Sequence, residues 1–291
     1  MDTGHVGFEQ LLQETIERAA GLDCPPLLAR ALHHAVFPGG ARVRPQLCVA
    51  VAAANGGNDP DLAAAAGAAI ELMHCASLVH DDLPCFDNAG ERRGKLSVHR
   101  AYGEQIAVLA GDALIVSAFE VLGRAASRQP ERLPQVLALI ARGCGAPYGI
   151  AAGQAWESEA SVELGLYHQA KTGALFIAAA CAGAAAAGVE VAPWRELGRC
   201  IGASYQVADD ILDATSDALT MGKPAGRDEA LGRPSAVREL GLEGAVCHLR
   251  ALVEEGVAAV PDCPGRERLQ GLVRQQAKRF FPRGAGRQVA A

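Results

Sequence analysis

Apolar residues recur at helical spacing along almost the whole chain. The apolar segments are separated at proline and glycine clusters such as Pro25-Pro26 and Pro38-Gly39-Gly40. No break is long or polar enough to be a linker, so we expect a single domain over residues 1–291. The pattern predicts helices at about 8–20, 26–36, 43–55, 60–80, 104–126, 131–145, 163–187, 193–214, 229–238, 243–257 and 266–279.

The composition favours an all-α fold. Half of the 291 residues are hydrophobic, which is enough for a large core, but only 4% are aromatic. Alanine is abundant, and small side chains suit closely packed helices better than sheets, which favour β-branched and aromatic residues. We therefore predict a single-domain, all-α bundle of about ten or more helices.

The net charge of −6 gives no general attraction to nucleic acid, so an anionic ligand must be held by local basic clusters or metal ions. The nine cysteines are scattered and form no Cys-x-x-Cys pair, which is typical of buried thiols in a reducing cytoplasm. The N-terminus does not resemble a secretory signal, and apolar stretches such as 178–189 are shorter than the roughly 20 residues that span a membrane. We expect a cytoplasmic protein with no transmembrane segment and no nucleic-acid partner.

Two apolar segments carry paired carboxylates. Residues 80–87 read His-Asp-Asp-Leu-Pro-Cys-Phe-Asp, and residues 209–213 read Asp-Asp-Ile-Leu-Asp. Neighbouring carboxylates repel each other, and negative charge is disfavoured near a helix C-terminus, so each group is expected to meet a cation. One Asp-Asp pair alone is more typical of a solvated helix end. Two pairs, each after a hydrophobic helix, favour a metal site.

The spacing of these carboxylates suits magnesium. Asp209 and Asp213 are four residues apart and share a helical face. Pro84 disfavours regular helix between Asp81 and Asp87, which lets both carboxylates face one cleft. The candidate ligands are hard oxygens, with no cysteine or histidine cluster spaced for zinc. We expect Mg²⁺, held by few carboxylates and completed by water and phosphate.

Basic loops lie next to the acidic segments. Residues 91–95 read Glu-Arg-Arg-Gly-Lys, and residues 37–45 read Phe-Pro-Gly-Gly-Ala-Arg-Val-Arg-Pro. Arginine binds phosphate oxygens in a bidentate manner, and glycine lets the backbone approach an anion. A basic loop alone is more often solvated surface. Two such loops beside an acidic metal site predict phosphate groups held between cations.

A further polar group accompanies the second acidic segment. Lys171 and Thr172 precede it, Gln206 lies one turn before Asp209, and Lys223 follows. Taken separately, Thr172 and Gln206 are more typical of polar core side chains with satisfied hydrogen bonds than of a reactive site. Together they can direct oxygen lone pairs toward developing positive charge while a lysine binds a departing diphosphate.

These segments together resemble the trans-prenyl diphosphate synthases, over nearly the whole chain. The likeness is strongest to the geranylgeranyl diphosphate synthases of carotenoid-making photosynthetic bacteria. It implies helices around a central cavity (the isoprenoid synthase fold), a homodimer, and three Mg²⁺ ions when substrate is bound. The segments that carry it are FPGGARVRP at 37–45, LMHCASLVHDDLPCFDN at 72–88, ERRGKLSVHRAYGE at 91–104, LAGDAL at 109–114, KTGALF at 171–176, YQVADDILD at 205–213 and MGKPAGRDEALGRPSAV at 221–237.

The resemblance also implies a role for each matching residue. The magnesium ligands would be Asp81, Asp87 and Asp209, supported by Asp82, Asp210 and Asp213. The allylic diphosphate would be held by Arg92, Lys171 and Lys223, and the catalytic set would be Lys171, Thr172, Gln206 and Lys223. Isopentenyl diphosphate would be bound by Arg44, His74 and Arg93, with help from His99.

One departure from the family concerns isopentenyl diphosphate. The family usually carries a lysine where this chain has Ala41, and that lysine contacts the diphosphate. Losing one charge-assisted contact costs about 1.5–3 kcal/mol if nothing replaces it. The neighbouring Arg42 is the candidate replacement.

Product length is expected to depend on the helix that precedes Asp81. Side chains four and five positions earlier lie about one turn lower and point toward the prenyl tail. Here they are Ser77 and Ala76, both small, whereas related bacterial farnesyl diphosphate synthases typically have an aromatic residue at the Ala76 position. Met73 and a neighbouring helix near Phe119 are the candidate floor. We therefore expect geranylgeranyl diphosphate as the product.

The predicted function is Mg²⁺-dependent condensation of isopentenyl diphosphate with dimethylallyl, geranyl or farnesyl diphosphate. Three alternatives stay open. A farnesyl diphosphate synthase differs only in where elongation stops. A terpene cyclase would not need Arg44 and Arg93 for a second diphosphate, and a non-catalytic partner subunit would show eroded aspartates, which are intact here.

Overall fold

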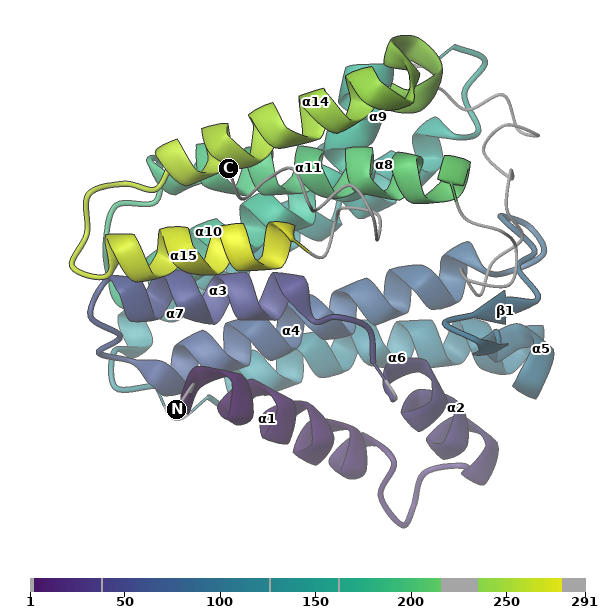
Figure 1. Cartoon of the computed structure of the whole chain (residues 1–291). Helices are drawn as coiled ribbons and strands as arrows, with labels where there is room; N and C mark the ends of the chain where they lie inside the picture. The colour runs from purple at the N-terminus through teal and green to yellow at the C-terminus, as the bar shows by residue number, and fades with distance from the viewer. Residues whose placement is uncertain (1–2, 38, 126, 162, 216–234, 279–291) are drawn as a thin grey trace.

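The computed structural model describes residues 3–37, 39–125, 127–161, 163–215 and 235–278. As the apolar spacing predicts, nearly all regular structure in these residues is helical, apart from a hairpin of two short strands, β1 (Glu91–Arg92) and β2 (Lys95–Leu96) (Figure 1). The α-helices are α1 (Thr3–Ala19), α2 (Pro26–Val36), α3 (Val43–Ala54), α4 (Pro60–Asp81), α5 (Val98–Tyr102), α6 (Glu104–Gly123), α7 (Leu133–Cys144), α8 (Ile150–Trp156), α9 (Leu164–His168), α10 (Ala174–Ala187), α11 (Trp194–Thr215), α14 (Ala236–Ala258) and α15 (Arg266–Ala277).

The predicted helices agree with the structure in order and in approximate ends. The segment predicted over 163–187 is α9 and α10 joined by one π-helical turn, η2 (Gln169–Gly173). A short 3₁₀ turn, η1 (Pro130–Arg132), precedes α7, and α5, α8 and the hairpin are additional to the prediction. Most of the helix predicted at 229–238 lies outside the described residues. Gly241, with a φ of 70°, interrupts α14 where a break is predicted.

Small residues let the helices approach closely around α4. Asp59 caps α4, with its carboxylate accepting from the Leu62 backbone N–H at 3.1 Å, and Pro60 occupies the first turn. α3, α6 and α10 pack against α4. On α10, a Cβ added at Gly183 would lie 2.2 Å from the carbonyl oxygen of Cys48, so glycine is required where α10 meets α3. The alanine and glycine content thus produces a tight bundle.

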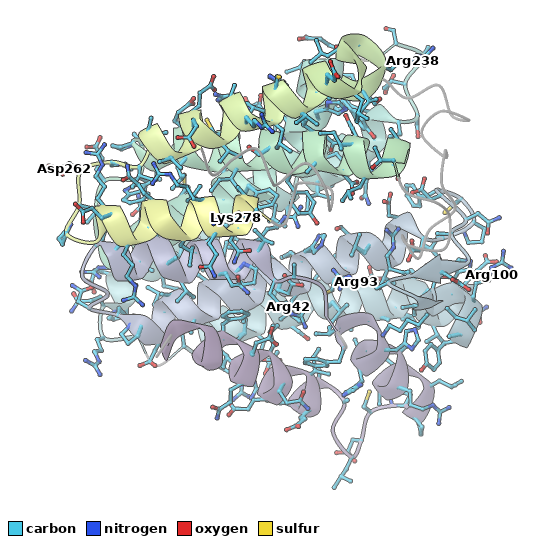
Figure 2. The ribbon with its side chains drawn as sticks, in the orientation of Figure 1. Arg42, Arg93, Arg100, Arg238, Asp262 and Lys278 are labelled. Atoms are coloured by element: carbon cyan, nitrogen blue, oxygen red, sulfur yellow. The ribbon has the colours of Figure 1, made fainter. Side chains whose placement is uncertain are left out.

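The two acidic segments come from different layers of this bundle. α10 is buried on nearly every side, and α11 packs between α10 and α14. The C-terminal ends of α4 and α11 both point toward the end of the molecule that carries β1 and α5 (Figure 1). Figure 2 shows Arg93 and Arg100 toward that end, and Asp262 at the opposite one.

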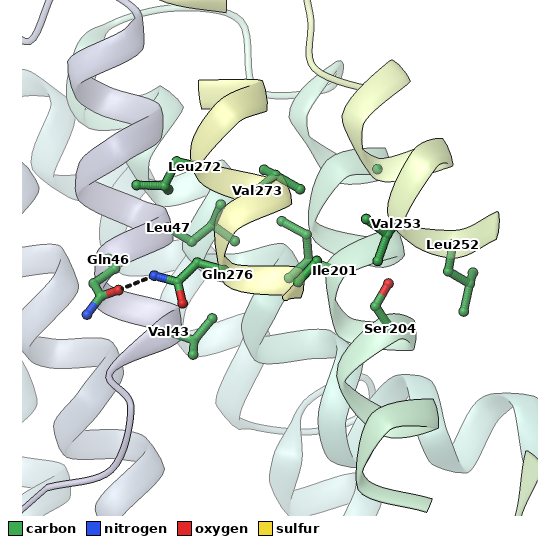
Figure 3. Close-up of a pocket in the computed structure, with 12 residues that line it drawn as sticks. Val43, Gln46, Leu47, Ile201, Ser204, Leu252, Val253, Leu272, Val273 and Gln276 are labelled. Atoms are coloured by element: carbon green, nitrogen blue, oxygen red, sulfur yellow. Dashed lines mark hydrogen bonds between the residues drawn. The ribbon is translucent and has the colours of Figure 1, made fainter. Parts of the chain in front are cut away.

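A small apolar cavity of about 30 Å³ lies under the last helix (Figure 3). Its lining comes from α3, α11, α14 and α15 and includes no titratable side chain. At its edge, Gln276 Nε2 donates to Gln46 Oε1 at 2.7 Å. Without titratable groups, this cavity has no side chain suited to bind an anion or a metal ion, and it is a gap between packed helices.

In the described part of the chain, three helical stretches are long and apolar enough to cross a membrane, by length and composition: Pro60–Asp81, Glu104–Gly123 and Gly165–Ala187. The expectation that the apolar stretches are too short to cross a membrane is therefore wrong: α4 and α6 have 22 and 20 residues, and α9, η2 and α10 form one continuous helical stretch. In the apolar windows of the first and third, 78% and 83% of residues are buried inside the bundle. The window in α6 is only 44% buried, so α6 leaves much apolar surface exposed.

Candidate active site

A cleft of about 350 Å³ lies between α4, α8, η2 and α11. It collects most of the residues that the sequence singles out, although they come from segments far apart in the chain. The predicted residues in its lining are Arg44, His74, Ser77, Asp81, Asp87, Arg92, Arg93, Lys171, Thr172, Gln206, Asp209 and Asp210. Those outside the lining are Met73, Ala76, Asp82, His99 and Asp213, and Lys223 is outside the described residues.

The first acidic wall forms where α4 ends. The backbone turns sharply after Asp82, and the Asp87 N–H donates to the Asp81 carbonyl at 2.9 Å, which brings both carboxylates to the cleft. Burial raises the pKa of Asp81; the nearby Asp87 carboxylate also raises it, whereas Lys171 lowers it. The predicted break at Pro84 therefore has the expected consequence: two carboxylates six positions apart share one cleft.

The second acidic wall belongs to α11. Asp209 is exposed and lines the cleft. Asp210 is buried and accepts from Gln206 Nε2 at 3.0 Å and from the Ala236 N–H at 2.7 Å. Burial raises the pKa of Asp210, while these two hydrogen bonds lower it. Asp210 thus ties α11 to the start of α14, and Asp213 is not brought to the cleft.

The donor set fits magnesium. Asp81 and Asp87 on one wall and Asp209 on the other offer only hard oxygen ligands, as Mg²⁺ prefers. Within the described residues, no three His, Cys, Asp or Glu side chains gather closely enough to hold a metal ion by themselves. An ion held here would need further oxygens from water and from a phosphate-bearing ligand.

Arg44 and His74 form a buried basic corner of the cleft. The Arg44 guanidinium lies 4.3 Å from the centre of the Phe176 ring and 5.4 Å from that of Tyr205. Its Nη1 is 3.4 Å from His74 Nε2, and its buried Nε has no hydrogen-bond partner among the residues that the structure describes. Burial and then the charge of Arg44 hold the pKa of His74 well below its usual range, so His74 is neutral. A buried cation with an unsatisfied donor fits an incoming anion.

Arg92 and Arg93 enter the cleft from the hairpin. Arg92 Nε donates to Asp82 at 3.0 Å, so Asp82 holds an arginine in place, which differs from the metal-supporting role implied by the resemblance. Arg93 has a φ of 55°, in the left-handed region. A Cβ added at Gly40 would lie 2.9 Å from Arg93 Nη2, so this glycine makes room for the guanidinium.

Arg42 does not replace the missing lysine, and that expectation is wrong. Arg42 is buried, and its Nη1 donates to Glu71 Oε1 at 2.6 Å while Nε donates to Glu9 at 3.0 Å. Burial alone lowers the pKa of Arg42, but Glu71 raises it above its usual value. Because its charge is already neutralised inside the protein, Arg42 anchors the loop, and Ala41 beside it is exposed.

Restoring a cation at Ala41 is expected to strengthen binding of isopentenyl diphosphate, the substrate that the family resemblance implies. Ala41→Lys should lower the KM for this substrate about tenfold, as one charge-assisted hydrogen bond would, and leave the KM for the allylic substrate nearly unchanged. Steady-state kinetics with each substrate varied in turn measures both constants. Ala41→Gln is the matched neutral control. An unchanged constant in Ala41→Lys would mean that another group already fills this position.

A chain of hydrogen bonds joins three residues that line the cleft. Thr172 Oγ1 donates to Gln206 Oε1 at 2.8 Å, and Gln206 Nε2 donates to Asp210 at 3.0 Å. The chain fixes the orientation of the Thr172 hydroxyl, whose lone pairs stay available to a cation in the cleft. Thr172 and Lys171 reach the cleft from the π-turn η2, a local irregularity common at functional sites.

The cleft also contains residues for which the sequence predicts no role. Gln154, Tyr167, His168 and Tyr205 line it, and Glu157 accepts from Lys171 Nζ at 2.6 Å. Gln154 and Glu157 belong to α8 and its C-terminal end, which no apolar pattern predicts because the helix is only seven residues long. The one available signal was two polar residues spaced three apart in an alanine- and glycine-rich segment.

Only one of the three α4 residues expected to set product length lines the cleft. Ser77 is in the lining, whereas Ala76 and Met73 are buried at 1% and 6% exposure and are not part of it. Phe119 is 43% exposed on α6, so this side chain is not placed as a floor for the cleft. The selection of product length by Ala76 and Met73 stays a prediction.

A helical bundle whose cleft sets aspartates against arginines and a lysine fits an enzyme that acts on diphosphate-bearing substrates. A family model for polyprenyl synthetases matches residues 25–259. The chain therefore belongs to the polyprenyl synthetase family, and it is a prenyltransferase.

Individual relatives agree with this assignment. The chain is 54% identical to a geranylgeranyl diphosphate synthase of Cereibacter sphaeroides, over 95% of this chain and 98% of the relative. It is 52% identical to a geranylgeranyl diphosphate synthase of Rhodobacter capsulatus, over 94% of this chain and 95% of the relative. A crystal structure of a Helicobacter pylori geranyltransferase, complexed with magnesium and isoprenyl diphosphate, matches with a TM-score of 0.81, 28% identity, and 96% and 97% coverage.

Proposed function

We propose that this prenyltransferase is a Mg²⁺-dependent geranylgeranyl diphosphate synthase, which adds isopentenyl diphosphate to dimethylallyl, geranyl and farnesyl diphosphates. The observation that carries the proposal is the cleft in which Asp81, Asp87 and Asp209 face Arg92 and Lys171. The names of the bacterial relatives support the product. A place in carotenoid biosynthesis would follow from that product.

Two different sets of side chains bind the diphosphate groups of the two substrates. Arg92 and Lys171 bind the allylic diphosphate beside the aspartates, and Lys223 is assigned to it by resemblance alone. Arg44, neutral His74 and Arg93 bind isopentenyl diphosphate. Magnesium, three ions by resemblance, supplies Lewis-acid stabilisation of charge on the leaving diphosphate when bound.

The reaction then needs no side-chain nucleophile. The allylic C–O bond breaks, and the bonding electrons leave with the diphosphate. The Thr172 hydroxyl, oriented by Gln206, presents lone pairs to the allylic cation. The alkene of isopentenyl diphosphate attacks the cation to form the new C–C bond, and the proton lost from the product goes to the released diphosphate.

We also infer a homodimer built on α6. This helix exposes Val108, Leu109, Val116 and Phe119 at 42%, 51%, 66% and 43%. A large exposed apolar face on a long helix is unfavourable in water and is typical of a subunit interface. Burial of α6 in a dimer, with the burial of the other long apolar helices in the bundle, supports an enzyme with no transmembrane segment. We also propose that it is cytoplasmic, and its net charge of −6 supports the absence of a nucleic-acid partner. We infer one domain over 1–291, which the continuous family match supports.

A radiochemical assay tests the proposed reaction. The purified protein is incubated with labelled isopentenyl diphosphate and each of the three allylic primers, with Mg²⁺ or with a chelator. We expect Mg²⁺-dependent incorporation of label into prenyl diphosphate with every primer. Hydrocarbon formed from a primer without isopentenyl diphosphate would indicate a terpene cyclase, and no turnover at all would indicate a non-catalytic subunit.

Blocking the helix below Asp81 is expected to shorten the product. Ala76→Tyr should stop elongation at fifteen carbons while turnover continues, because the metal and diphosphate groups lie above the block. The larger side chain at this buried position should also cost about 1–3 kcal/mol of stability through overpacking. Chromatography of the dephosphorylated products measures chain length, and Ala76→Ser is the control of small volume. A twenty-carbon product from Ala76→Tyr would show that Ala76 does not face the tail.

A further inference from the structure

α8 packs directly on the backbone of the segment that carries Lys171. A Cβ added at Gly153 would lie 2.4 Å from Lys171 Cα, so only glycine allows this approach. Gln154 and Glu157 are three residues apart and therefore lie on the same side of the helix. Gln154 contacts Asp81 in the first acidic wall, and Glu157 contacts Lys171.

The contacts of these two side chains are specific. Gln154 Nε2 donates to the Ser77 carbonyl at 3.1 Å and lies 3.4 Å from Asp81 Oδ1. Glu157 Oε1 accepts from Lys171 Nζ at 2.6 Å and from the Tyr167 hydroxyl at 2.5 Å. The Lys171 ammonium is 3.6 Å from Asp81 Oδ1, so it lies between two carboxylates and is closer to Glu157.

The contact with Glu157 bears on the competition between Lys171 and a bound metal ion for the Asp81 carboxylate. Lys171 and a metal ion held by Asp81 would compete for the same carboxylate, since both are positively charged. The Lys171 and Glu157 side chains are only 20% and 16% exposed, so an ammonium without an anionic partner here would be costly. The Tyr167 hydroxyl donates to the same oxygen and fixes the Glu157 carboxylate in place.

We propose that Glu157 is a positioning residue that holds the Lys171 ammonium in place for the allylic diphosphate and prevents it from moving closer to Asp81 than 3.6 Å. The proposal rests on the proposed function, because it assumes that Lys171 meets a diphosphate. Glu157 acts through Lys171 and does not itself touch the reacting atoms. Its removal should therefore matter only while Lys171 is present.

A double-mutant cycle on binding tests this dependence. Glu157→Gln, Lys171→Gln and the double variant are titrated by calorimetry with an unreactive allylic thiolodiphosphate and Mg²⁺, so that no turnover enters the readout. We expect each single variant to bind about tenfold more weakly than wild type, and the double variant to bind no more weakly than Lys171→Gln. Glutamine keeps the size and the acceptor oxygen of Glu157, so the fold should persist. Glu159→Gln, an exposed carboxylate two residues away, should leave affinity unchanged.

Two results would overturn the proposal. Independent losses that multiply in the double variant would mean that Glu157 contributes directly, for example as a metal ligand. A lower Tm in Glu157→Gln with unchanged affinity would mean that its role is structural. Failure of wild type to bind the thiolodiphosphate would instead remove the proposed function itself, and that outcome is visible before any variant is made.

Discussion

Asp209→Ala is expected to abolish turnover and leave the helical fold intact. Asp209 is exposed at the cleft on α11, so its removal deletes a magnesium ligand without opening a core cavity. Metal-ion stabilisation of leaving-group charge contributes several kcal/mol, so the rate at saturating Mg²⁺ should fall by at least about a thousandfold. The measurement is the initial rate of label incorporation, with far-UV circular dichroism to verify the fold.

The control for this variant removes a carboxylate far from the cleft. Asp262 is exposed at the opposite end of the molecule (Figure 2), and Asp262→Ala should keep the wild-type rate. Asp81→Ala should also lose turnover, since Asp81 lines the facing wall. An Asp209→Ala enzyme that retains a near wild-type rate would disprove the assignment of this cleft as the metal site.

Arg42→Met is expected to lower the free energy of unfolding by about 3–5 kcal/mol, because it leaves the Glu71 carboxylate buried without its partner. Urea-induced unfolding measures the change. Arg42→Met combined with Glu71→Leu should recover much of the loss, since no charge is then left unpaired. Arg199→Met breaks an exposed pair with Glu196 and should cost less than about 1 kcal/mol. A loss of that small size in Arg42→Met would contradict the anchoring role.

Much of the fold could be predicted because long helices leave a repeating apolar pattern. α4, for example, begins at the Asp59 cap and Pro60 and ends where Pro84 forbids continuation. The sequence did not predict α8, because two helical turns are too short to show a repeating apolar pattern. The π-turn η2 has no sequence signature of its own, and the hairpin strands have only two residues each.

The site was predictable only where residue type dictates chemistry. Asp81, Asp87 and Asp209 stand out because clustered carboxylates beside apolar helices repel one another, and the structure does bring them to one cleft. The role of Arg42 was not predictable, because its partner Glu71 is 29 positions away on another helix. Tertiary packing decides which basic side chains face the cleft and which pair with buried carboxylates.

The most direct test of a geranylgeranyl diphosphate synthase is the length of its product. Wild-type protein is incubated with labelled isopentenyl diphosphate, dimethylallyl diphosphate and Mg²⁺, and the dephosphorylated products are separated by reversed-phase chromatography. We predict that the label accumulates in the twenty-carbon alcohol geranylgeraniol. Elongation that stops at the fifteen-carbon farnesol would contradict the proposed product.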